Sequence, residues 1–515
     1  MTPPLRPKRR PQTLSAAAGF LGIPIGSKWH EILISGVTLD SADTAPGDLF
    51  IGRSGAHGHG ATYAAAAISA GAAAVLTDEA GSALLQDLPA QIPVLVVPDV
   101  AGTIGRLAAW VYGDPAKELT TIGVTGTNGK TTTSWLIESA LRHAGVAVGL
   151  LGTLGVHLSA SASGERIELP SSRTTPEATE LQAILAVMRE AGITHVAMEV
   201  SSHALALGRV NGLVYDLAIF TNLSQDHLDF HSNLESYFAA KQKLFDPEQA
   251  RKGLVWLGDE WGRTLAARAR IPIVTFDSEG LADWTAVNIV SAATGTSTFE
   301  VHGPNSVVVP VRLQLPGRFQ VANAVAAVAA LVELGLPPEI AAAGVSNCVG
   351  VPGRMENVAM GQPFLAVVDY AHTPDAVSRV CAAVSRIITG RLLVLVGAGG
   401  DRDRAKRSDM GREAAACAAV VVVTDDNPRS EDPAAIRSEV LVGAKSATQV
   451  NRAEAREIPD REAAIDFLVG LARPGDAVLI LGKGAETTQE VRGRFLQFDD
   501  RVVLRAALAR QGWDI

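Results

Sequence analysis

The sequence has very little cysteine, which argues against two kinds of structural site. Cys348, Cys381 and Cys417 are the only cysteines among 515 residues, and no two of them have CxxC spacing. A disulfide framework needs several cysteines, and a structural zinc site needs them close together in the chain. The sequence indicates neither, and a reducing cytoplasm is the expected location.

The sequence also lacks an excess of basic charge and any long apolar run. Lys and Arg number 45 against 54 Asp and Glu, a formal net charge of −9, so we expect no nucleic-acid partner. No run of about 18 apolar residues remains once glycines and turn residues are counted, so no membrane-spanning helix is expected. Residues 1–14 are basic and proline-rich without a cleavage pattern, which predicts a loose tail.

What the chain has throughout is α/β patterning. Hydrophobic residues make up 47% and charged residues 19%, which is typical of a globular protein, and the length favours about three domains. Apolar strands alternate with helical stretches, and many strands are continuous apolar runs, as in parallel sheets covered by helices. Segments with Pro and Gly near Tyr112 and Val351 mark the junctions. We predict an α/β fold with domains at 1–115, 116–351 and 352–515.

The strongest local motif is the glycine loop in TIGVTGTNGKTTTS, between an apolar strand and a helix. In such loops backbone N–H groups converge on phosphate oxygens, a lysine neutralises the terminal phosphates and a hydroxyl reaches a magnesium ion. Lys130 and Thr131 fit these roles. Val124 stands where the strict pattern has a glycine, so the motif is a variant form that still predicts a nucleotide site.

Polar side chains follow two further strands of the middle domain. Glu199 ends the strand THVAMEV, and a polar loop follows the strand in DLAIFTNL. The members of this loop are Asn222, Asp226, His227, Asp229 and His231. Open α/β sheets bind ligands at the carboxyl ends of their strands, and oxygen ligands with an occasional His suit Mg²⁺. The sequence predicts a magnesium site that Thr131 helps to complete; ordinary hydrogen-bonded loop residues are the alternative.

Four strands of the last domain also end in polar loops. These loops are DYAH (369–372), GGDR (399–402), DNPR (426–429) and GKGAE (482–486). Guanidinium groups pair with carboxylates, and Asp or Glu pairs with ammonium, so the mixture suits a zwitterionic ligand. We expect the loops to converge on one crevice; the alternative is four separate polar turns.

Together these motifs resemble the Mur ligases of peptidoglycan synthesis, in the same order along the chain. The matching segments are GTNGKTTT, SRTTP, MEVSSH, TNLSQDHLDFH, AAK in YFAAKQKLF, GRFQVANAVAA, GRME, DYAHTPD, GGDRDRAKR and DNPR. The resemblance runs from about Gly36 to about Glu490. It implies a small α/β uridine-nucleotide domain, a central P-loop parallel-sheet ATPase domain and a C-terminal Rossmann-like domain. Within the family the chain resembles members that add a diamino acid to UDP-N-acetylmuramoyl-L-alanyl-D-glutamate, and DNPR resembles the form specific for meso-diaminopimelate.

The resemblance also implies roles for individual residues. ATP would be bound by Gly126, Thr127, Asn128, Gly129, Lys130, Thr131, Thr132, Asn323, Arg354 and Asp369. The UDP substrate would be bound by Leu39, Ser41, Ala56, His57, Gly58, Thr174, Thr175, Ser201 and Arg209. Diaminopimelate would be bound by Arg407, Asp426, Asn427, Pro428, Arg429, Gly482 and Glu486. Magnesium would be held by Thr131, Glu199, His227 and Lys241, the last as a carbamate, and Lys130, Lys241, Glu199 and His227 would be the catalytic set.

The implied activity is ATP-dependent amide ligation through an acyl phosphate, by a cytoplasmic monomer with small-molecule substrates and Mg²⁺. Leu207, Ala42 and Ala485 depart from the family pattern, which leaves some uridine and dipeptide contacts open. Three alternatives remain at this point: the same reaction with L-lysine, a folylpolyglutamate-type ligase, and a P-loop ATPase switch that acts on a protein partner.

Overall fold

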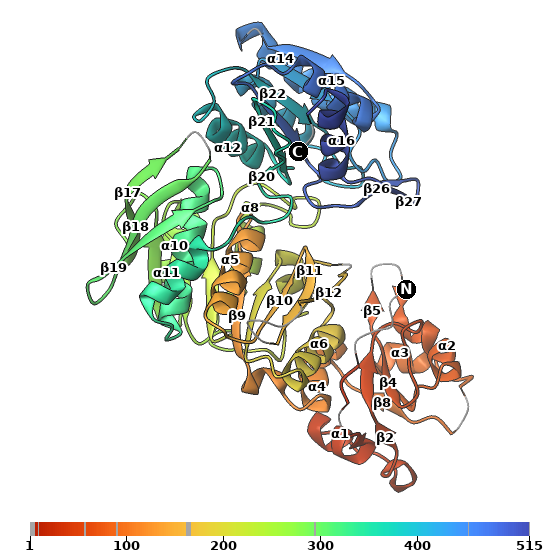
Figure 1. Cartoon of the computed structure of the whole chain (residues 1–515). Coiled ribbons are helices and arrows are strands. Elements are labelled where there is room, and N and C mark those ends of the chain that lie inside the picture. Colours follow the sequence, from red (N-terminus) through yellow and green to blue (C-terminus); the bar gives the residue numbers. More distant parts are fainter. Residues whose placement is uncertain are drawn as a thin grey trace.

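The computed structural model describes residues 6–8, 10–55, 58–88, 91–160, 166–171, 173–292, 295–451 and 453–513. Three main sheets follow one another along the chain, and Figure 1 shows them as separate bodies, with the first at one end, the third at the other and the largest between them. The division at residues 115 and 351 remains a proposal, and each main sheet lies within one of the three segments.

The first sheet is parallel, four-stranded and ordered β3-β4-β7-β8. Its strands are β3 (Gly36–Thr38), β4 (Asp48–Gly52), β7 (Ala74–Thr77) and β8 (Val94–Val96). The helices beside it are α1 (Leu14–Leu21), α2 (Ala64–Ser69), α3 (Glu79–Ala83) and α4 (Val100–Val111). Small two-stranded sheets flank it, formed by β1 (Gln12–Thr13) with β2 (Leu33–Ile34) and by β5 (Ser54–Gly55) with β6 (Gly58–His59).

The expectation of a loose tail over residues 1–14 is wrong for its described part. Gln12–Thr13 forms β1, and Arg6 donates to the buried carboxylate of Asp48 at 2.5 Å. A buried carboxylate needs a partner, and the tail supplies it. The basic composition that suggested a free tail therefore ties this segment to the first sheet.

The central sheet has eleven strands, in the order β12-β11-β10-β13-β9-β14-β15-β16-β17-β18-β19. They are β9 (Thr120–Thr125), β10 (Val148–Gly152), β11 (Gly155–Ser159), β12 (Ile167–Leu169), β13 (His195–Glu199), β14 (Leu217–Phe220), β15 (Gly253–Trp256), β16 (Ile273–Asp277), β17 (Trp284–Ser291), β18 (Ser297–Gly303) and β19 (Val307–Leu313). Its helices are α5 (Lys130–His143), α6 (Ala178–Glu190), α7 (Ser202–Ala206), α8 (Leu234–Gln242), α9 (Glu260–Arg268), α10 (Arg318–Glu333) and α11 (Pro338–Ser346).

The prediction of a parallel sheet holds for the run from β10 to β17 and is wrong at both edges. The strands β11, β12, β18 and β19 pair antiparallel. Buried and more exposed residues alternate along β18 and β19, which is typical of antiparallel strands with one face toward solvent. Helix α10, rich in Ala and Val, is buried along most of its length and anchors the core of this part.

The third main sheet has six strands, in the order β20-β21-β25-β22-β23-β24. They are β20 (Glu356–Asn357), β21 (Leu365–Asp369), β22 (Leu392–Val396), β23 (Val420–Val423), β24 (Glu454–Glu457) and β25 (Ala477–Leu481), followed by the hairpin β26 (Thr488–Val491) and β27 (Arg494–Gln497). Its helices are α12 (Pro374–Ser385), α13 (Lys406–Cys417), α14 (Pro433–Asn451), α15 (Arg461–Leu471) and α16 (Asp500–Arg510). The four strands expected from sequence are confirmed, and they lie side by side.

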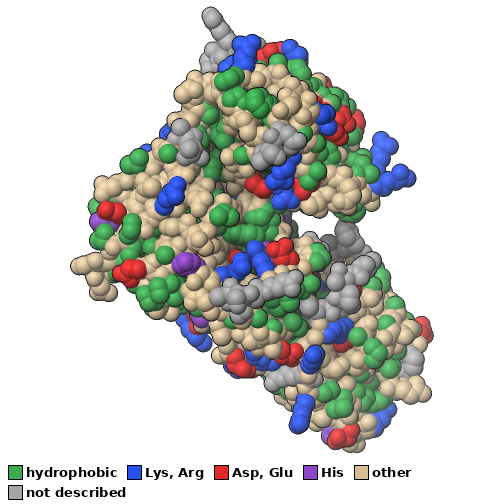
Figure 2. All heavy atoms as spheres, in the orientation of Figure 1, with side chains coloured by type: hydrophobic (Ala, Val, Ile, Leu, Met, Phe, Trp, Pro, Cys, Tyr) green, Lys and Arg blue, Asp and Glu red, His purple; other side chains and the backbone are tan. Residues whose placement is uncertain are grey.

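The surface is indented where the parts of the chain meet. Figure 2 shows a deep notch between the third and the first body, with acidic and basic side chains gathered beside it. Within the described residues, no helix is both long and apolar enough to cross a membrane.

A buried ion pair ties α15 to α16. Arg461 donates to Asp500 through Nε at 2.8 Å and Nη2 at 2.7 Å, and both side chains are almost fully buried. Replacing Arg461 by alanine leaves a buried carboxylate unpaired, so we expect a loss of about 3 to 5 kcal/mol in the free energy of unfolding. Urea denaturation followed by circular dichroism measures it. Arg510→Ala, which removes an exposed pair with Asp466, is the control; equal effects of the two substitutions would contradict the assignment.

Candidate functional site

The glycine loop 126–129 joins the end of β9 to the start of α5. Gly126 and Gly129 have φ angles of 150° and 90°, which favour glycine. A Cβ atom on Gly126 would lie 1.9 Å from Thr221 Oγ1, and one on Gly129 would lie 2.5 Å from Asn323 Oδ1. Only glycine at both positions allows the loop to pack this closely against Thr221 and Asn323.

The loop is held in shape by the segment after β14. Asn222 accepts from the Asn128 N–H and donates to the Asn128 carbonyl, both at 2.9 Å, and Thr221 Oγ1 donates to that carbonyl at 2.6 Å. The Thr127 hydroxyl accepts from the Ser224 N–H at 3.0 Å. These bonds fix the loop backbone before any ligand arrives, which reduces the ordering cost of binding.

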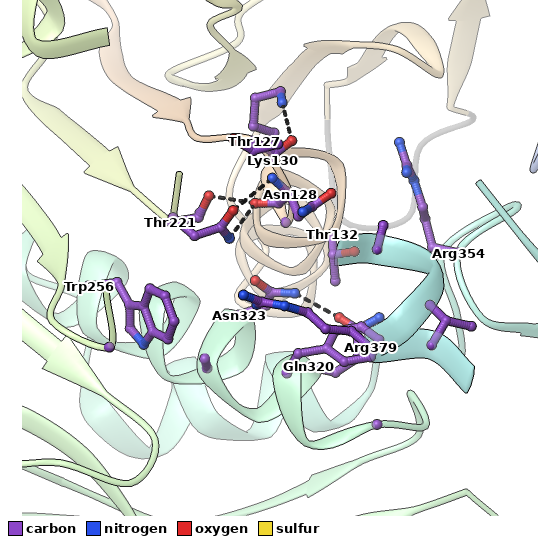
Figure 3. A pocket seen from close by; sticks show the side chains of 18 of the residues that line it. Thr127, Asn128, Lys130, Thr132, Thr221, Trp256, Gln320, Asn323, Arg354 and Arg379 are labelled. Atoms are coloured by element: carbon purple, nitrogen blue, oxygen red, sulfur yellow. Dashed lines mark hydrogen bonds between the residues drawn. The ribbon is translucent and has the colours of Figure 1, made fainter. Parts of the chain in front are cut away.

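Two lysines converge on one carbonyl of this loop. Lys130 Nζ and Lys241 Nζ each donate to the Gly126 carbonyl at 2.8 Å. Lys130 also donates to the Thr127 carbonyl at 2.9 Å (Figure 3). Lys241 is 1% exposed, and its pKa is lowered well below the usual value by burial and then by Lys130. Two ammonium groups this close repel each other, so Lys241 has a strong tendency to be a neutral amine.

The carboxylate of Glu199 and the hydroxyl of Thr131 meet at the ends of β13 and α5. Thr131 Oγ1 donates to Glu199 Oε2 at 3.0 Å and accepts from Arg354 Nη2 at 2.9 Å. Thr153 donates through its N–H and hydroxyl to the same carboxylate. A hydroxyl and a carboxylate oxygen side by side beside a phosphate loop are the ligands that Mg²⁺ prefers.

This donor set fits Mg²⁺ only with help from a ligand. Among the described residues, no group of three or more His, Cys, Asp and Glu side chains is arranged to hold a metal ion. A cation here would use Thr131 and Glu199 together with phosphate oxygens, as Mg²⁺ commonly does in nucleotide sites.

His227 lies in a cluster of aromatic rings. Its ring is 4.8 Å from that of His203, its Nε2 is 3.3 Å from Asp226 Oδ2, and burial lowers its pKa to about 3. A neutral imidazole remains able to bind a metal. Asp226 also faces Lys406 at 3.4 Å and His372 at 3.8 Å, both from the third body, so this cluster joins the central and C-terminal parts.

One cavity of about 1040 Å³ collects most of the predicted nucleotide residues. Its lining includes Thr127, Asn128, Gly129, Lys130, Thr131, Thr132, Thr174, Glu199, Ser201, His227, Lys241, Asn323, Arg354 and Asp369. Gly126, the first residue of the loop, is not part of this lining. Figure 3 shows Trp256, Asn323 and Arg354 around this space, with Arg379 from the third body. Asp369 accepts from the Met355 and Ala371 N–H groups, so it holds the backbone near Arg354.

The predicted UDP-substrate residues fall into two groups. Leu39 and Ser41 follow β3, and Gly58 lies in the hairpin after the neighbouring β4; Ala56 and His57, like Ser172 of the SRTTP run, lie outside the described residues. Thr174, Thr175, Ser201 and Arg209 lie in the central body, where Thr175 Oγ1 donates to the Glu199 carbonyl at 2.9 Å.

A cluster of arginines lies between these two groups. Glu177 Oε1 is 2.9 Å from Arg209, and Glu177 Oε2 is 3.4 Å from Arg53 of the first body. Arg173 is 3.8 Å from the same carboxylate. Three guanidinium groups, from the first and the central body, thus surround the carboxylate of Glu177.

The DNPR loop, the GKGAE loop and β26 meet on the third body. Asn427 Nδ2 donates to Glu486 Oε2 at 2.8 Å, and its Oδ1 accepts from Lys483 Nζ at 3.1 Å. Arg429 Nη1 donates to the Gly400 carbonyl at 2.7 Å, and its Nε is 3.2 Å from Glu490. The predicted residues Asp426, Asn427, Pro428, Arg429, Gly482 and Glu486 are thus brought together.

Arg407 lies behind this loop cluster. Its side chain is 1% exposed, and its guanidinium is paired with Glu431 at 2.8 Å and Glu439 at 3.0 Å. These ion pairs hold the loops in position. For the predicted direct contact with an amino acid, Arg407 would have to release Glu431 or Glu439.

Several residues shape the site in ways that the local sequence did not predict. Asn222, which the sequence places in the polar loop of the predicted magnesium site, holds the glycine loop. Lys483 is fully buried and links the GKGAE and DNPR loops, a role that its position in a glycine-rich loop could have suggested. Trp256 and Glu490 gave no local signal, because only the fold brings them to the cavity and to Arg429.

The fold and site define a three-part α/β protein in which a glycine loop of the phosphate-binding type borders a cavity lined by residues of the central and C-terminal bodies. Residues 33–112 match the profile described as Mur ligase family, catalytic domain; residues 124–331 match Mur ligase middle domain, and residues 353–484 match Mur ligase, glutamate ligase domain. The chain belongs to the Mur ligase family, whose members are ATP-dependent ligases.

Named relatives match over nearly the whole chain. UDP-N-acetylmuramoyl-L-alanyl-D-glutamate–2,6-diaminopimelate ligase of Streptomyces avermitilis is 48% identical and is covered over 96% of each chain. The protein of the same name from Streptomyces coelicolor is 48% identical, with 98% of each chain covered. A solved structure of a ligase with this name is 32% identical, with a TM-score of 0.66, and the match covers 97% of this chain and 100% of that one.

Proposed function

We propose that this protein joins meso-2,6-diaminopimelate to UDP-N-acetylmuramoyl-L-alanyl-D-glutamate at the expense of ATP, in the synthesis of peptidoglycan precursors. The observation that carries the proposal is the closeness of two complementary sites. The glycine loop with Lys130 faces Arg354 across the nucleotide cavity, and the GKGAE loop packs on the backbone of Gly353 and Tyr370 beside Arg354. A phosphate site and a site for a zwitterion thus share one border.

Amide formation from a carboxylate is uphill in water, so the carboxylate needs activation. A carboxylate oxygen of the D-glutamyl side chain attacks the γ-phosphorus of ATP, ADP leaves, and an acyl phosphate results. The amine of diaminopimelate attacks the acyl carbon, the C–O bond to phosphate breaks, and the ammonium proton is lost. Lys130 stabilises charge on the transferred phosphoryl group, and closure of the third body excludes water from the acyl phosphate.

Thr131 and Glu199 would hold Mg²⁺, with His227 contributing after movement of its loop. When bound, Mg²⁺ supplies positive charge to the phosphate oxygens. We propose in addition that the protein acts as a cytoplasmic monomer.

Lys241 is proposed to carry a carbamate. Its neutral amine attacks CO₂, the N–C bond forms and one amine proton is released, which turns a neutral group into an anion. The carbamate is an anion that attracts the nearby ammonium group of Lys130, since both lysines contact the Gly126 carbonyl. The burial that lowers the pKa of Lys241 therefore favours the modification.

Arg429 is expected to determine the choice of amino acid. Diaminopimelate carries a second carboxylate where lysine has none, and a guanidinium fork pairs with it. Arg429→Ala should therefore reduce kcat/KM for diaminopimelate about a hundredfold, while the KM values of ATP and the UDP dipeptide change little. Initial rates with diaminopimelate and L-lysine on both proteins measure the effect.

Arg494→Ala is the matched control, because Arg494 lies exposed on the neighbouring hairpin strand β27. It should leave both rates unchanged. A native preference for lysine would refute the proposed substrate, and an equal loss for both amino acids would show that Arg429 serves only the loop.

The two rival functions differ from the proposed one in the substrates required for release of phosphate from ATP. A P-loop switch would hydrolyse ATP without either small-molecule substrate. A folylpolyglutamate-type ligase would require a folate and glutamate. We expect phosphate release only when the UDP dipeptide is present, with full turnover requiring diaminopimelate as well.

A further inference from the structure

A second cavity, separate from the nucleotide site, lies at the far end of α5. Its volume is about 460 Å³, within the range of small-molecule sites. It is lined by Trp135, Glu138, Ser139, Arg142, His143, Arg166, Asn347, Cys348, Val349 and Gly350, none of which lines the nucleotide cavity. Val349, at the wall formed by residues 347–350, is 82% exposed. The cavity therefore shares no lining residue with the nucleotide cavity.

Three buried polar atoms in this cavity have no hydrogen-bond partner among the described residues. They are Glu138 Oε1, Arg142 Nε and Arg166 Nε. The Glu138 side chain is 1% exposed, with Arg142 Nη1 and Arg166 Nε at 3.9 and 3.7 Å from Oε1. Buried polar groups are almost always hydrogen-bonded, so this cluster has unused capacity for a ligand. Burial raises the pKa of Glu138 against the opposing effect of Arg166 and Arg142.

The walls of the cavity hold these groups in place. The Arg166 guanidinium lies over the Trp135 ring, 4.3 Å from its centre, and donates to His157. Burial lowers the pKa of His157 to about 4, so its ring is neutral at pH 7. Glu168 lies 3.3 Å from Arg166 Nε but is largely exposed. The arginines and glutamates around the cavity therefore balance in charge.

We propose that this cavity binds a free α-amino acid as a zwitterion. A simple anion would face the buried carboxylate of Glu138, and a simple cation would face two guanidinium groups. A molecule with adjacent carboxylate and ammonium groups pairs with Arg142 and Arg166 through the first and with Glu138 through the second. Because the protein groups lie within 4 Å of one another, the ligand charges must be close together, as they are on one α-carbon.

The position of the cavity connects it to the nucleotide site. Helix α5 begins at the glycine loop and is about 20 Å long, so a ligand at its far end is remote from the phosphates. The opposite wall, residues 347–350, leads directly into Arg354, which donates to Thr131 in the nucleotide cavity. An amino acid bound here contacts both the helix that follows the phosphate loop and the connection to the third body. It therefore favours the relative position of these two segments that binds it more tightly.

Titration calorimetry on the full-length protein, saturated with ADP, tests the proposal. The probes are the common α-amino acids, with acetate and methylammonium as the corresponding half-molecules, at up to about 10 mM. At least one amino acid should bind, with its affinity weakened about tenfold by Arg142→Gln and also by Glu138→Gln. Arg268→Gln is the matched control, because Arg268 is an exposed arginine in the last turn of α9 as Arg142 is in the last turn of α5.

The variants should keep the native melting temperature and ADP affinity, which shows that the fold and the nucleotide site are intact. If Arg142→Gln does not fold, Glu138→Gln alone gives the comparison. Equal affinities in native and variant proteins would place the binding elsewhere, and acetate binding as tightly as the amino acids would indicate an anion site. No binding by any probe would show that the cavity holds water only. Each of these results overturns the proposal, while leaving the proposed ligase reaction untouched.

Discussion

Lys130→Ala is expected to lower kcat/KM by about a thousandfold or more without unfolding the protein. Lys130 Nζ bonds only to carbonyl groups of its own loop among the described residues, so its loss removes little packing and no interdomain contact. In the reaction it stabilises charge on the transferred phosphoryl group, and a charge-stabilising group of this kind contributes several kcal/mol to the transition state. Coupled assays of ADP release at saturating ATP measure the effect.

Lys117→Ala is the control for Lys130→Ala. Lys117 is exposed and, among the residues that the structure describes, forms an ion pair with Asp114 alone, so its removal should leave the rate unchanged. Retention of more than a few per cent of native activity in Lys130→Ala would contradict the assignment of the phosphate loop.

Lys241→Ala is expected to lower kcat about a hundredfold or more and to regain activity with added formate or acetate. The alanine leaves a buried space beside the Gly126 carbonyl, and a small carboxylate there would replace the anion of the carbamate. Lys243→Ala is the matched control, because Lys243 is two residues away and exposed. It should be fully active.

The modification itself can be detected independently. Native protein exchanged with ¹³CO₂ should show a carbamate signal by ¹³C NMR, and Lys241→Ala should lack it. At a fixed concentration of dissolved CO₂ the signal should grow with rising pH, because the reaction of the neutral Lys241 amine with CO₂ releases a proton. Normal activity of Lys241→Ala would show that no carbamate is needed.

Local sequence patterns were sufficient to predict the parallel strands and the polar residues at the ends of those strands. Continuous apolar runs predicted the parallel strands, and the polar residues that follow them predicted the positions of Glu199 and the DNPR loop. This works because carboxyl ends of adjacent parallel strands lie at one edge, as β13, β9 and β14 do here.

Other features depend on contacts between distant segments and could not be read locally. The antiparallel strands β18 and β19 were missed because their alternating pattern is short and half exposed. The segment containing Arg6 resembled a free tail, since its partner Asp48 lies 42 residues away. The pairing of Arg407 with Glu431 likewise depends on tertiary structure, whereas the family resemblance suggested only a pocket residue.

The direct test of the acyl-phosphate ligase reaction is the fate of oxygen in the substrate carboxylate. UDP-N-acetylmuramoyl-L-alanyl-D-glutamate labelled with ¹⁸O in the reacting carboxylate is incubated with ATP, Mg²⁺, meso-diaminopimelate and the protein, and both products are analysed by mass spectrometry. We predict a UDP-tripeptide that keeps one ¹⁸O in its new amide and inorganic phosphate that carries the other. Phosphate without ¹⁸O, or ATP hydrolysis without a tripeptide, would contradict the account.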